Sequence, residues 1–431
     1  MASGVVLFTR DLRVHDHPAL AAAARTFGQV LPLFVYDREI FDGPYAAPNR
    51  VRFLLDSLDD LDSSLDGALL RRSGAVPAEA IRAAREANAS AIFMSSDVSA
   101  LAQRRERRLR RLCEEAGVQL RTFPGVTVVP PEALRPAGGD HFRVFTPYYR
   151  AWRQVLWRPV EKPVERIEAI SGLRSAAPPE ITGEPSPEGQ RGGEAAGRQR
   201  MKGWLEKGLA AYAARHDDLA ADATSRLSPY LHFGCLSALE LAVRAAEQGG
   251  EEFVRQLSWR DFHHQVTHAF PAMSRDDYRR PRQWRHDEVA LDAWKRGLTG
   301  VPIVDAGMRQ LAREGWMHNR ARLLVASFLT RRLAVDWRAG ARHFLDLLAD
   351  GDVANNSGNW QWVAGTGNDT RPNRVFNPIR QAHRFDPEGD YVRRYVPELE
   401  SVEGGAVHEP WKLEPLLRRR LTYPDPIVSL A

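Results

Sequence analysis

The chain has 431 residues, which is long enough for two or three domains of ordinary size. Hydrophobic residues make up 43% and charged residues 27%, as in soluble globular proteins, and no apolar run approaches the ~20 residues of a membrane span. The net charge of +5 permits contact with nucleic acid but does not establish it. The two cysteines, Cys113 and Cys235, exclude a disulfide framework and a four-thiolate metal cluster. The N-terminus also lacks a signal-peptide pattern, so we expect a cytoplasmic protein. We further expect a monomer that binds no membrane and no metal.

Residues 1–130 alternate β-rich runs with stretches of helical period, which predicts an α/β domain built on a doubly wound parallel sheet. The predicted strands are Val5–Phe8, Val30–Val35, Ala91–Met94 and Gln119–Phe123, and the clearest predicted helices are Arg50–Leu65 and Pro77–Asn88. No Gly-x-Gly-x-x-Gly follows the first strand, so the common dinucleotide-binding fingerprint is absent. Arg104–Arg111 holds six arginines in eight residues, and we interpret it as a solvated helix face.

Residues 131–200 are interpreted as a connector between domains. The stretch 161–200 is rich in Pro, Gly, Glu and Ser and shows little apolar periodicity, which indicates a linker crossing the surface. Residues 201–431 have helical patterns almost throughout and predict a larger, all-helical domain. The clearest helical patterns are Leu236–Glu247, Glu252–His268, Ile303–Glu314, Arg320–Arg332 and Ala341–Leu348.

One stretch of the helical part, Asp350–Trp362, gathers two carboxylates, four carboxamides and two indoles within thirteen residues. A carboxylate can accept from a ring imide N–H, and a carboxamide can face a ring nitrogen whose protonation changes with redox state. Glycines allow a flat ligand to approach the backbone closely. The alternative is a polar loop after a helix, capped by Asp and Asn and anchored by two core indoles.

Two further groups carry polar side chains in helical context. Thr224–Ser228 precedes an apolar helical pattern, with Ser228 as the expected N-cap and Pro229 as the first helical residue, and such a helix start also favours phosphate. Gln256, Trp259, Arg260 and His263 fall on one face of a helix, which fits either a base and a phosphate or a face packed between helices.

Trp316–Arg322 is a third group, for which the alternative interpretation is a helix N-terminus with surface arginines. Tryptophan is also concentrated in this part of the chain, with seven of the eleven indoles between Trp259 and Trp362. Large helical domains use indoles as core filler, so this concentration alone does not indicate function.

In order and spacing, four of these strings resemble the DNA photolyase and cryptochrome family, in particular microbial class I photolyases acting on cyclobutane pyrimidine dimers. The strings are Thr9–Asp16, Thr224–Pro229, Trp316–Arg322 and Asp350–Trp362. The resemblance implies FAD in the helical domain, an antenna chromophore in the sheet domain and UV-damaged DNA as the partner. It implies that light-excited, reduced FAD lends an electron to a dimer extruded from the duplex, which makes the protein a lyase.

The resemblance also assigns roles to residues. It implies an FAD site made by Tyr212, Thr224, Ser225, Arg226, Leu227, Ser228, Arg260, Asp350, Gly351, Asp352 and Asn356, with Arg320 or Arg322 as counter-charge. It implies a lesion pocket made by Gln256, Trp259, Asn319, Arg320, Leu323, Trp362 and Gln381, with Gln256, Asn319 and Asn356 taking part in catalysis. Trp360, Trp337 and Trp284 would pass electrons from the surface to the flavin, whereas Trp294 and Trp316 are expected to be core residues.

Two positions of the lesion pocket favour different substrates. Gln256 stands where most dimer photolyases carry Glu and where six-four photolyases carry Gln. Asn319 stands where six-four enzymes of the eukaryotic kind need an acidic histidine, and an amide is no acid. Asn319 therefore favours the dimer as substrate, with a six-four photolyase or a signalling cryptochrome as alternatives.

The antenna is expected near Phe34, Arg50 and Asp97. The string Ala47-Pro48-Asn49 before Arg50, the short loop after Asp37 and Asp97 itself resemble deazaflavin-binding relatives more than folate-binding ones. We therefore expect 8-hydroxy-5-deazaflavin, with methenyltetrahydrofolate as the alternative.

Overall fold

The computed structural model describes residues 2–430 except 44, 171, 369, 370 and 372. Its N-terminal part is a five-stranded parallel sheet in the order β3-β2-β1-β4-β5, as predicted for an α/β domain. The strands are β1 (Ser3–Phe8), β2 (Gln29–Asp37), β3 (Leu70–Gly74), β4 (Ala89–Ser95) and β5 (Gln119–Phe123). The four predicted strands are confirmed, but β3 was missed. Its sequence, Leu-Arg-Arg-Ser-Gly, is polar because β3 lies at an edge of the sheet and is not buried on both faces.

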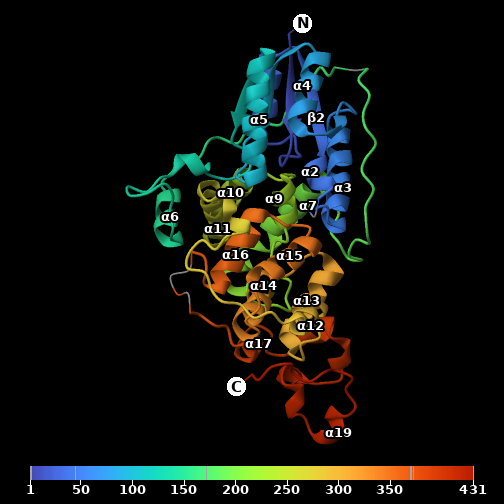
Figure 1. Ribbon diagram of the computed structural model, residues 1–431, viewed down its shortest axis with the longest axis vertical. Coiled ribbons are helices and arrows are strands. Elements are labelled where there is room, and N and C mark those ends of the chain that lie inside the picture. The colour runs from blue at the N-terminus through green and yellow to red at the C-terminus, as the bar shows by residue number, and fades with distance from the viewer. Residues whose placement is uncertain (1, 44, 171, 369–370, 372, 431) are drawn as a thin grey trace.

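Helices cover both faces of this sheet, which makes it doubly wound (Figure 1). Val6 and Phe8 of β1 share a core with the first group of helices, α1 (Pro18–Thr26) and α3 (Pro48–Ser64). Val5 and Leu7 point to the opposite face and share a core with α4 (Val76–Glu86) and α5 (Ala100–Ala116). A short α2 (Arg38–Phe41) follows β2. Most arginines of Arg104–Arg111 are exposed along α5, as expected of a solvated face.

The connector is more structured than its composition suggests. It contains a helix, α6 (Phe145–Trp152), beside the helical domain, and α7 (Glu194–Lys207) begins seven residues before the predicted boundary at 201. Residues 194–200, predicted as the end of the linker, are therefore helical. Glu194, the first residue of α7, accepts from the N–H of Val14 at 2.7 Å and so binds α7 to the sheet domain.

Between α6 and α7, the chain crosses the outer side of the sheet domain, as predicted for a surface linker (Figure 1). Ala169 forms an isolated parallel bridge with Val30 of β2. Further along, Ala176 N–H donates to the Arg71 carbonyl of β3 at 2.7 Å. These contacts give the unpaired edge of the sheet a partial cover.

The C-terminal part is helical, as predicted, and contains no strand among the residues that are described. Its helices are α8 (Tyr212–Arg215), α9 (Ser228–Phe233), α10 (Ala238–Glu247), α11 (Glu251–Ala269), α12 (Glu288–Arg296), α13 (Pro302–Glu314), α14 (Asn319–Ser327), α15 (Trp337–Leu347), α16 (Val353–Ala364), α17 (Pro378–Phe385), α18 (Asp390–Tyr395) and α19 (Pro415–Arg418). A π-helical turn, Phe328–Arg332, prolongs α14. The core of this part includes Trp294, Trp337 and Trp360, all almost fully buried.

The two parts share buried contacts, some aromatic and some polar. Phe53 of α3 stacks on Phe233 of α9, with ring centroids 5.1 Å apart. Arg50 of α3 donates to the Leu348 carbonyl at 3.0 Å, after the end of α15. Asp261 of α11 is buried and accepts from the N–H groups of Val128 and Val129, each at 3.0 Å, and from the Trp152 indole at 3.0 Å. Burial raises the pKa of Asp261 to about 6, so it is mostly ionised at neutral pH and needs these donors.

Candidate functional site

The predicted phosphate-binding stretch lies at the start of α9, but the expected capping is wrong by one residue. Leu227 is the N-cap and Ser228 is the first residue of the helix. The Ser228 hydroxyl instead accepts from the Trp316 indole at 3.2 Å. Arg226 has φ of 52°, and this left-handed residue turns the chain into the helix. The hydroxyl oxygen of Thr224 is buried and has no hydrogen-bond partner in the structure.

Arg226 is held firmly beside this helix start. Its guanidinium donates to Glu314 at 2.6 Å and to Asp222 at 2.6 Å, and it lies 4.3 Å from the ring centroid of Trp316. Trp316 is buried, as predicted for a core residue. Tyr212, the more distant residue of the predicted phosphate site, packs its ring against Phe253 of α11.

The stretch Asp350–Trp362 is largely helical, since α16 begins at Val353, and so the polar-loop interpretation is wrong for most of it. Asp352 is the N-cap, and its carboxylate accepts from Asn355 N–H at 2.7 Å. The stretch is joined to Trp316–Arg322 by a backbone bond from Ala349 N–H to the Gly315 carbonyl at 2.8 Å.

The counter-charge for Asp350 is Arg322, whose guanidinium donates to one carboxylate oxygen at 2.8 Å. Arg320 points elsewhere and makes a bidentate pair with Asp217. The second oxygen of Asp350 is buried and has no hydrogen-bond partner in the structure. Asn356 is buried and donates to the Ala341 carbonyl of α15 at 3.0 Å, which leaves its side-chain oxygen as a possible acceptor.

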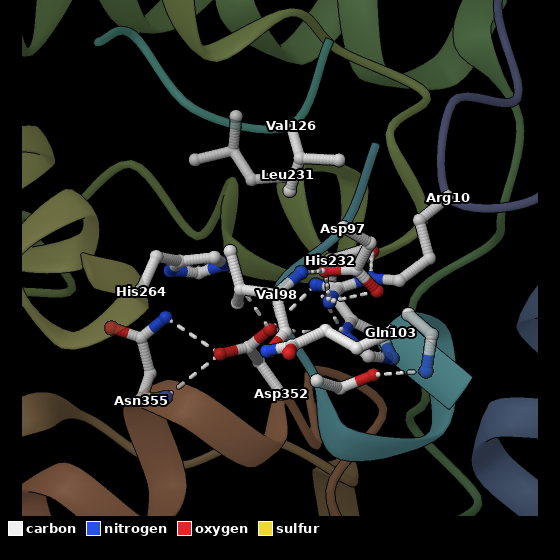
Figure 2. A network of polar contacts seen from close by, with 12 residues as sticks. Arg10, Asp97, Val98, Gln103, Val126, Leu231, His232, His264, Asp352 and Asn355 are labelled. Atoms are coloured by element: carbon white, nitrogen blue, oxygen red, sulfur yellow. Dashed lines mark hydrogen bonds and ion pairs between the residues drawn. The ribbon is translucent and has the colours of Figure 1, made fainter. Parts of the chain in front are cut away.

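Asp352 lies at the centre of a polar network that joins the two parts of the molecule (Figure 2). Arg10, directly after β1, donates to Asp352 at 2.5 Å, and the His264 ring nitrogen lies 3.6 Å from the same carboxylate. Burial alone would raise the pKa of Asp352, but His264, Arg10 and Arg260 together hold that pKa well below its usual range. Burial lowers the pKa of His264 to about 4, so the lasting positive charges beside Asp352 are the arginines.

Sequence reasoning did not find Arg10 and His264 as members of the site. A signal for Arg10 was available, since it belongs to the string Thr9–Asp16. Nothing in that string indicated that its partner would lie 342 residues away. His264 follows a helix face that was identified, and its neighbour His263 was on that face.

The predicted face of α11, made of Gln256, Trp259, Arg260 and His263, contacts several different segments. His263 lies against Gly358 of α16, where a Cβ would overlap the imidazole. Arg260 donates to the Val126 carbonyl at 2.6 Å and to the Leu231 carbonyl at 3.3 Å. The side chain of Gln256 is half-buried.

Trp259, predicted to stack on a lesion, has one ring face covered. Phe145 of α6 stacks on it with centroids 3.6 Å apart and planes at 9°. Tyr149 stacks in turn on Phe145 at 5.6 Å. The connector thus supplies an aromatic backing to Trp259 and leaves at most the opposite ring face for a ligand.

The remaining predicted lesion residues are spread over three helices. Asn319 is exposed at the first position of α14, and Leu323 is half-buried one turn later. Trp362 of α16 is half-buried, with the Arg374 guanidinium 4.9 Å from its ring centroid and the Phe376 ring beside it. Gln381 lies half-buried on α17.

The three predicted electron-transfer tryptophans lie in or next to segments that contact α15 or its start. Trp360 packs on α15 at Gly340, where a Cβ would overlap the indole, and Trp337 lies one turn earlier on the same helix. Trp284 precedes Arg285, whose N–H donates to the Ala334 carbonyl at 2.8 Å, three residues before Trp337. Trp294, expected to be a core residue, is fully buried and meets Trp360 edge-on at 6.0 Å.

A separate cavity of about 380 Å³ opens at the carboxyl ends of the strands, where open α/β sheets bind ligands. The three residues predicted for the antenna, Phe34, Arg50 and Asp97, all line it. Gly351 and Ala354 of the stretch Asp350–Trp362 line its other side.

The helical residues fit FAD. Thr224 and Asp350 each present a buried oxygen without a hydrogen-bond partner, one at a helix start that favours phosphate and one that can accept from an imide N–H. In the described part of the chain, no three His, Cys, Asp or Glu side chains form a group suited to a metal ion. None of the described helices is long and apolar enough to cross a membrane.

Comparison with known proteins agrees with this geometry. Residues 4–166 match the family model described as DNA photolyase, and residues 253–431 match the FAD binding domain of DNA photolyase. The chain is 53% identical to a Streptomyces griseus protein named deoxyribodipyrimidine photo-lyase, covering 100% of this chain and 97% of that one.

Two solved structures are similar over nearly their whole length. A bacterial class III photolyase from Agrobacterium tumefaciens has a TM-score of 0.92 and 32% identity, covering 100% of this chain and 95% of that one. A Synechocystis cryptochrome has a TM-score of 0.91 and 30% identity, covering 100% and 97%. The fold and the site therefore define a two-domain photolyase-like flavoprotein with an FAD-binding domain. The chain belongs to the DNA photolyase and cryptochrome family.

The contact of Gly358 with His263 predicts a sensitive position. Gly358→Ala should force α11 and α16 apart, lower the free energy of unfolding by about 1–3 kcal/mol and weaken FAD retention. His263→Ala added to that variant removes the overlapping ring and should restore part of both losses. Gly203→Ala, in α7 where nothing lies within 4 Å of the new Cβ, is the matched control. It should stabilise by about 0.5–1 kcal/mol, as measured by urea unfolding. A Gly358→Ala protein as stable as wild type would contradict this packing.

Proposed function

We propose that the protein is a deoxyribodipyrimidine photolyase that splits cyclobutane pyrimidine dimers in UV-damaged DNA under blue light. The observation that carries the proposal is the match over the whole chain to relatives of that name, at 53% identity in one case. FAD, when bound and reduced, supplies the light-driven electron that opens the cyclobutane ring, and the electron returns at the end of the cycle. We propose that it works as a monomer in the cytoplasm, and that the domains divide near residues 130 and 200.

The protein side chains have three tasks in this reaction, and the first is to bind FAD. Thr224–Ser228, including Arg226, would hold the cofactor phosphates at the start of α9, with Tyr212 nearby. Asp350, backed by Arg322, would accept from the flavin imide, and Asn356 would face the ring nitrogen whose protonation varies.

The second task is recognition of the extruded lesion. Trp259 and Trp362 would flank it, and the stacking of Phe145 on Trp259 supports this role because it fixes the plane of the indole. Gln256 would donate to a pyrimidine carbonyl, with Asn319 and Arg320 at the start of α14. Asn319 is exposed and so is available to DNA. The third task is the choice of lesion: Asn319, which cannot act as an acid, favours dimers over six-four products.

A signalling cryptochrome is the second candidate, because the chain is also similar in structure to a Synechocystis cryptochrome. Repair assays distinguish the two functions. We expect reduced protein under blue light to restore a dimer-containing oligonucleotide and to leave a six-four product unchanged, as followed by recovery of pyrimidine absorbance. Gln256→Glu should keep or raise dimer repair. The substitution would add a charge-assisted contact that Gln256 cannot make, worth about 1–2 kcal/mol.

Repair of only the six-four product would overturn the substrate assignment. Bound FAD with no repair of either lesion would favour the signalling function instead. A large loss of dimer binding in Gln256→Glu would mean that α11 faces the lesion differently.

We further propose that Trp360, Trp337 and Trp284 carry electrons inward during photoreduction. Trp360→Phe should strongly slow the light-driven reduction of oxidised FAD, while repair by chemically pre-reduced protein continues. Trp294→Phe is the matched control, because Trp294 is equally buried and touches Trp360 but lies outside the proposed chain. Equal photoreduction rates in Trp360→Phe and wild type, measured by absorption, would contradict the proposal.

We also propose that the cavity lined by Phe34, Arg50 and Asp97 holds an 8-hydroxy-5-deazaflavin antenna. Its size and its place at the strand ends support a flat aromatic ligand. Protein isolated from cells able to make deazaflavin should release it on denaturation, as identified by mass spectrometry. Release of methenyltetrahydrofolate instead would overturn the assignment.

A further inference from the structure

An arginine of the sheet domain forms an ion pair with the N-cap residue of α16. Arg10 follows β1, and its guanidinium donates to Asp352 at 2.5 Å with one terminal nitrogen and to Asp97 at 3.2 Å with the other (Figure 2). Its third nitrogen donates to the His232 carbonyl of α9 at 3.0 Å. Each guanidinium nitrogen thus has a partner, with Asp97 in the sheet domain and Asp352 and His232 in the helical domain.

These charges are removed from water. The exposed fraction of the side chain is 20% for Arg10, 9% for Asp97 and 7% for Asp352. In such surroundings the loss of one partner leaves a buried charge uncompensated, which is far more costly than the loss of a surface ion pair. The position of Asp352 therefore depends on Arg10.

Arg10 also faces the cavity at the strand ends. Arg10 and Asp97 line that cavity from the sheet domain, and Gly351, Val353 and Ala354 line it from the other side. The walls of the cavity thus include the residues immediately before and after Asp352. A contiguous chain of ion pairs, Asp97–Arg10–Asp352, runs from the cavity to the cap of α16.

We propose that Arg10 is a positioning residue of the flavin site, which holds Asp352 from the sheet domain and makes FAD retention depend on the wall of the neighbouring cavity. The inference rests on the proposed function and on the role in FAD binding that the family resemblance implies for Asp352. Arg10 acts through Asp352 and not by contact with the substrate. If a ligand in the cavity shifts Arg10 and thereby changes FAD affinity, thermodynamic linkage requires FAD to change the affinity of that ligand by the same factor.

The direct test is the rate at which FAD leaves the protein in the dark, followed by the rise of flavin fluorescence. Arg10→Gln should release FAD about tenfold faster than wild type, which corresponds to the loss of one charge-assisted hydrogen bond. Arg10→Lys keeps the charge but cannot serve all three partners at once, and it should fall between the two. Removal of a positive charge beside Asp352 should also make the reduction potential of bound flavin more negative.

Arg71→Gln is the matched control. Arg71 of β3 also pairs with two carboxylates, Asp59 and Asp62, and donates to a backbone carbonyl, that of Leu58. Its side chain is 14% exposed, so a similar ion-pair group is lost in the same domain but away from the cavity. It should change the unfolding midpoint while the FAD release rate stays within about twofold of wild type.

A double-mutant cycle separates action through Asp352 from a general loss of structure. If Arg10 acts through Asp352, Arg10→Gln should add little to the faster FAD release of Asp352→Asn. Additive effects, or a wild-type release rate in Arg10→Gln, would overturn this inference and leave the proposed function intact. A wild-type protein that binds no FAD would overturn both.

Discussion

The carboxylate of Asp352 caps α16 with one oxygen and pairs with Arg10 through the other. A buried charge of this kind is tolerated only with a partner. The position of the start of α16 therefore depends on its contact with the sheet domain. Asn356 and Trp360 lie one and two turns further along the same face of α16. Asn356, proposed to face the flavin, and Trp360, proposed to pass electrons to it, are therefore oriented by a helix whose start contacts Arg10, just after the first strand.

Two glycines then set how close the neighbouring helices come. Gly358 admits the imidazole of His263 from α11, and Gly340 admits the indole of Trp360 to α15. Each position excludes even a methyl group, so α11, α15 and α16 form a tightly packed unit with little freedom to adjust. This rigidity suits a site in which electron transfer depends on distances between fixed rings.

Segments before the helical domain contribute to the site. Val128 and Val129, just before the connector, bind the buried carboxylate of Asp261, and Phe145 of the connector covers one face of Trp259. Both contacts lie on α11, the helix that carries Gln256. The outward face of that helix is thus positioned by chain segments from outside the helical domain.

The sequence by itself determined the two fold classes, most helices and the family to which the chain belongs, because apolar periodicity and contiguous motifs are local properties. It could not locate β3, since an edge strand with a polar sequence owes its existence to pairing with β2. It left open whether Arg320 or Arg322 would face Asp350, because both lie near the start of α14 and only packing directs Arg322 to Asp350 and Arg320 to Asp217. It also gave no sign that Phe145 would cover Trp259. The partnership of Arg10 with Asp352 joins residues 342 positions apart, and only the docking of the two domains in the tertiary structure brings these charges together.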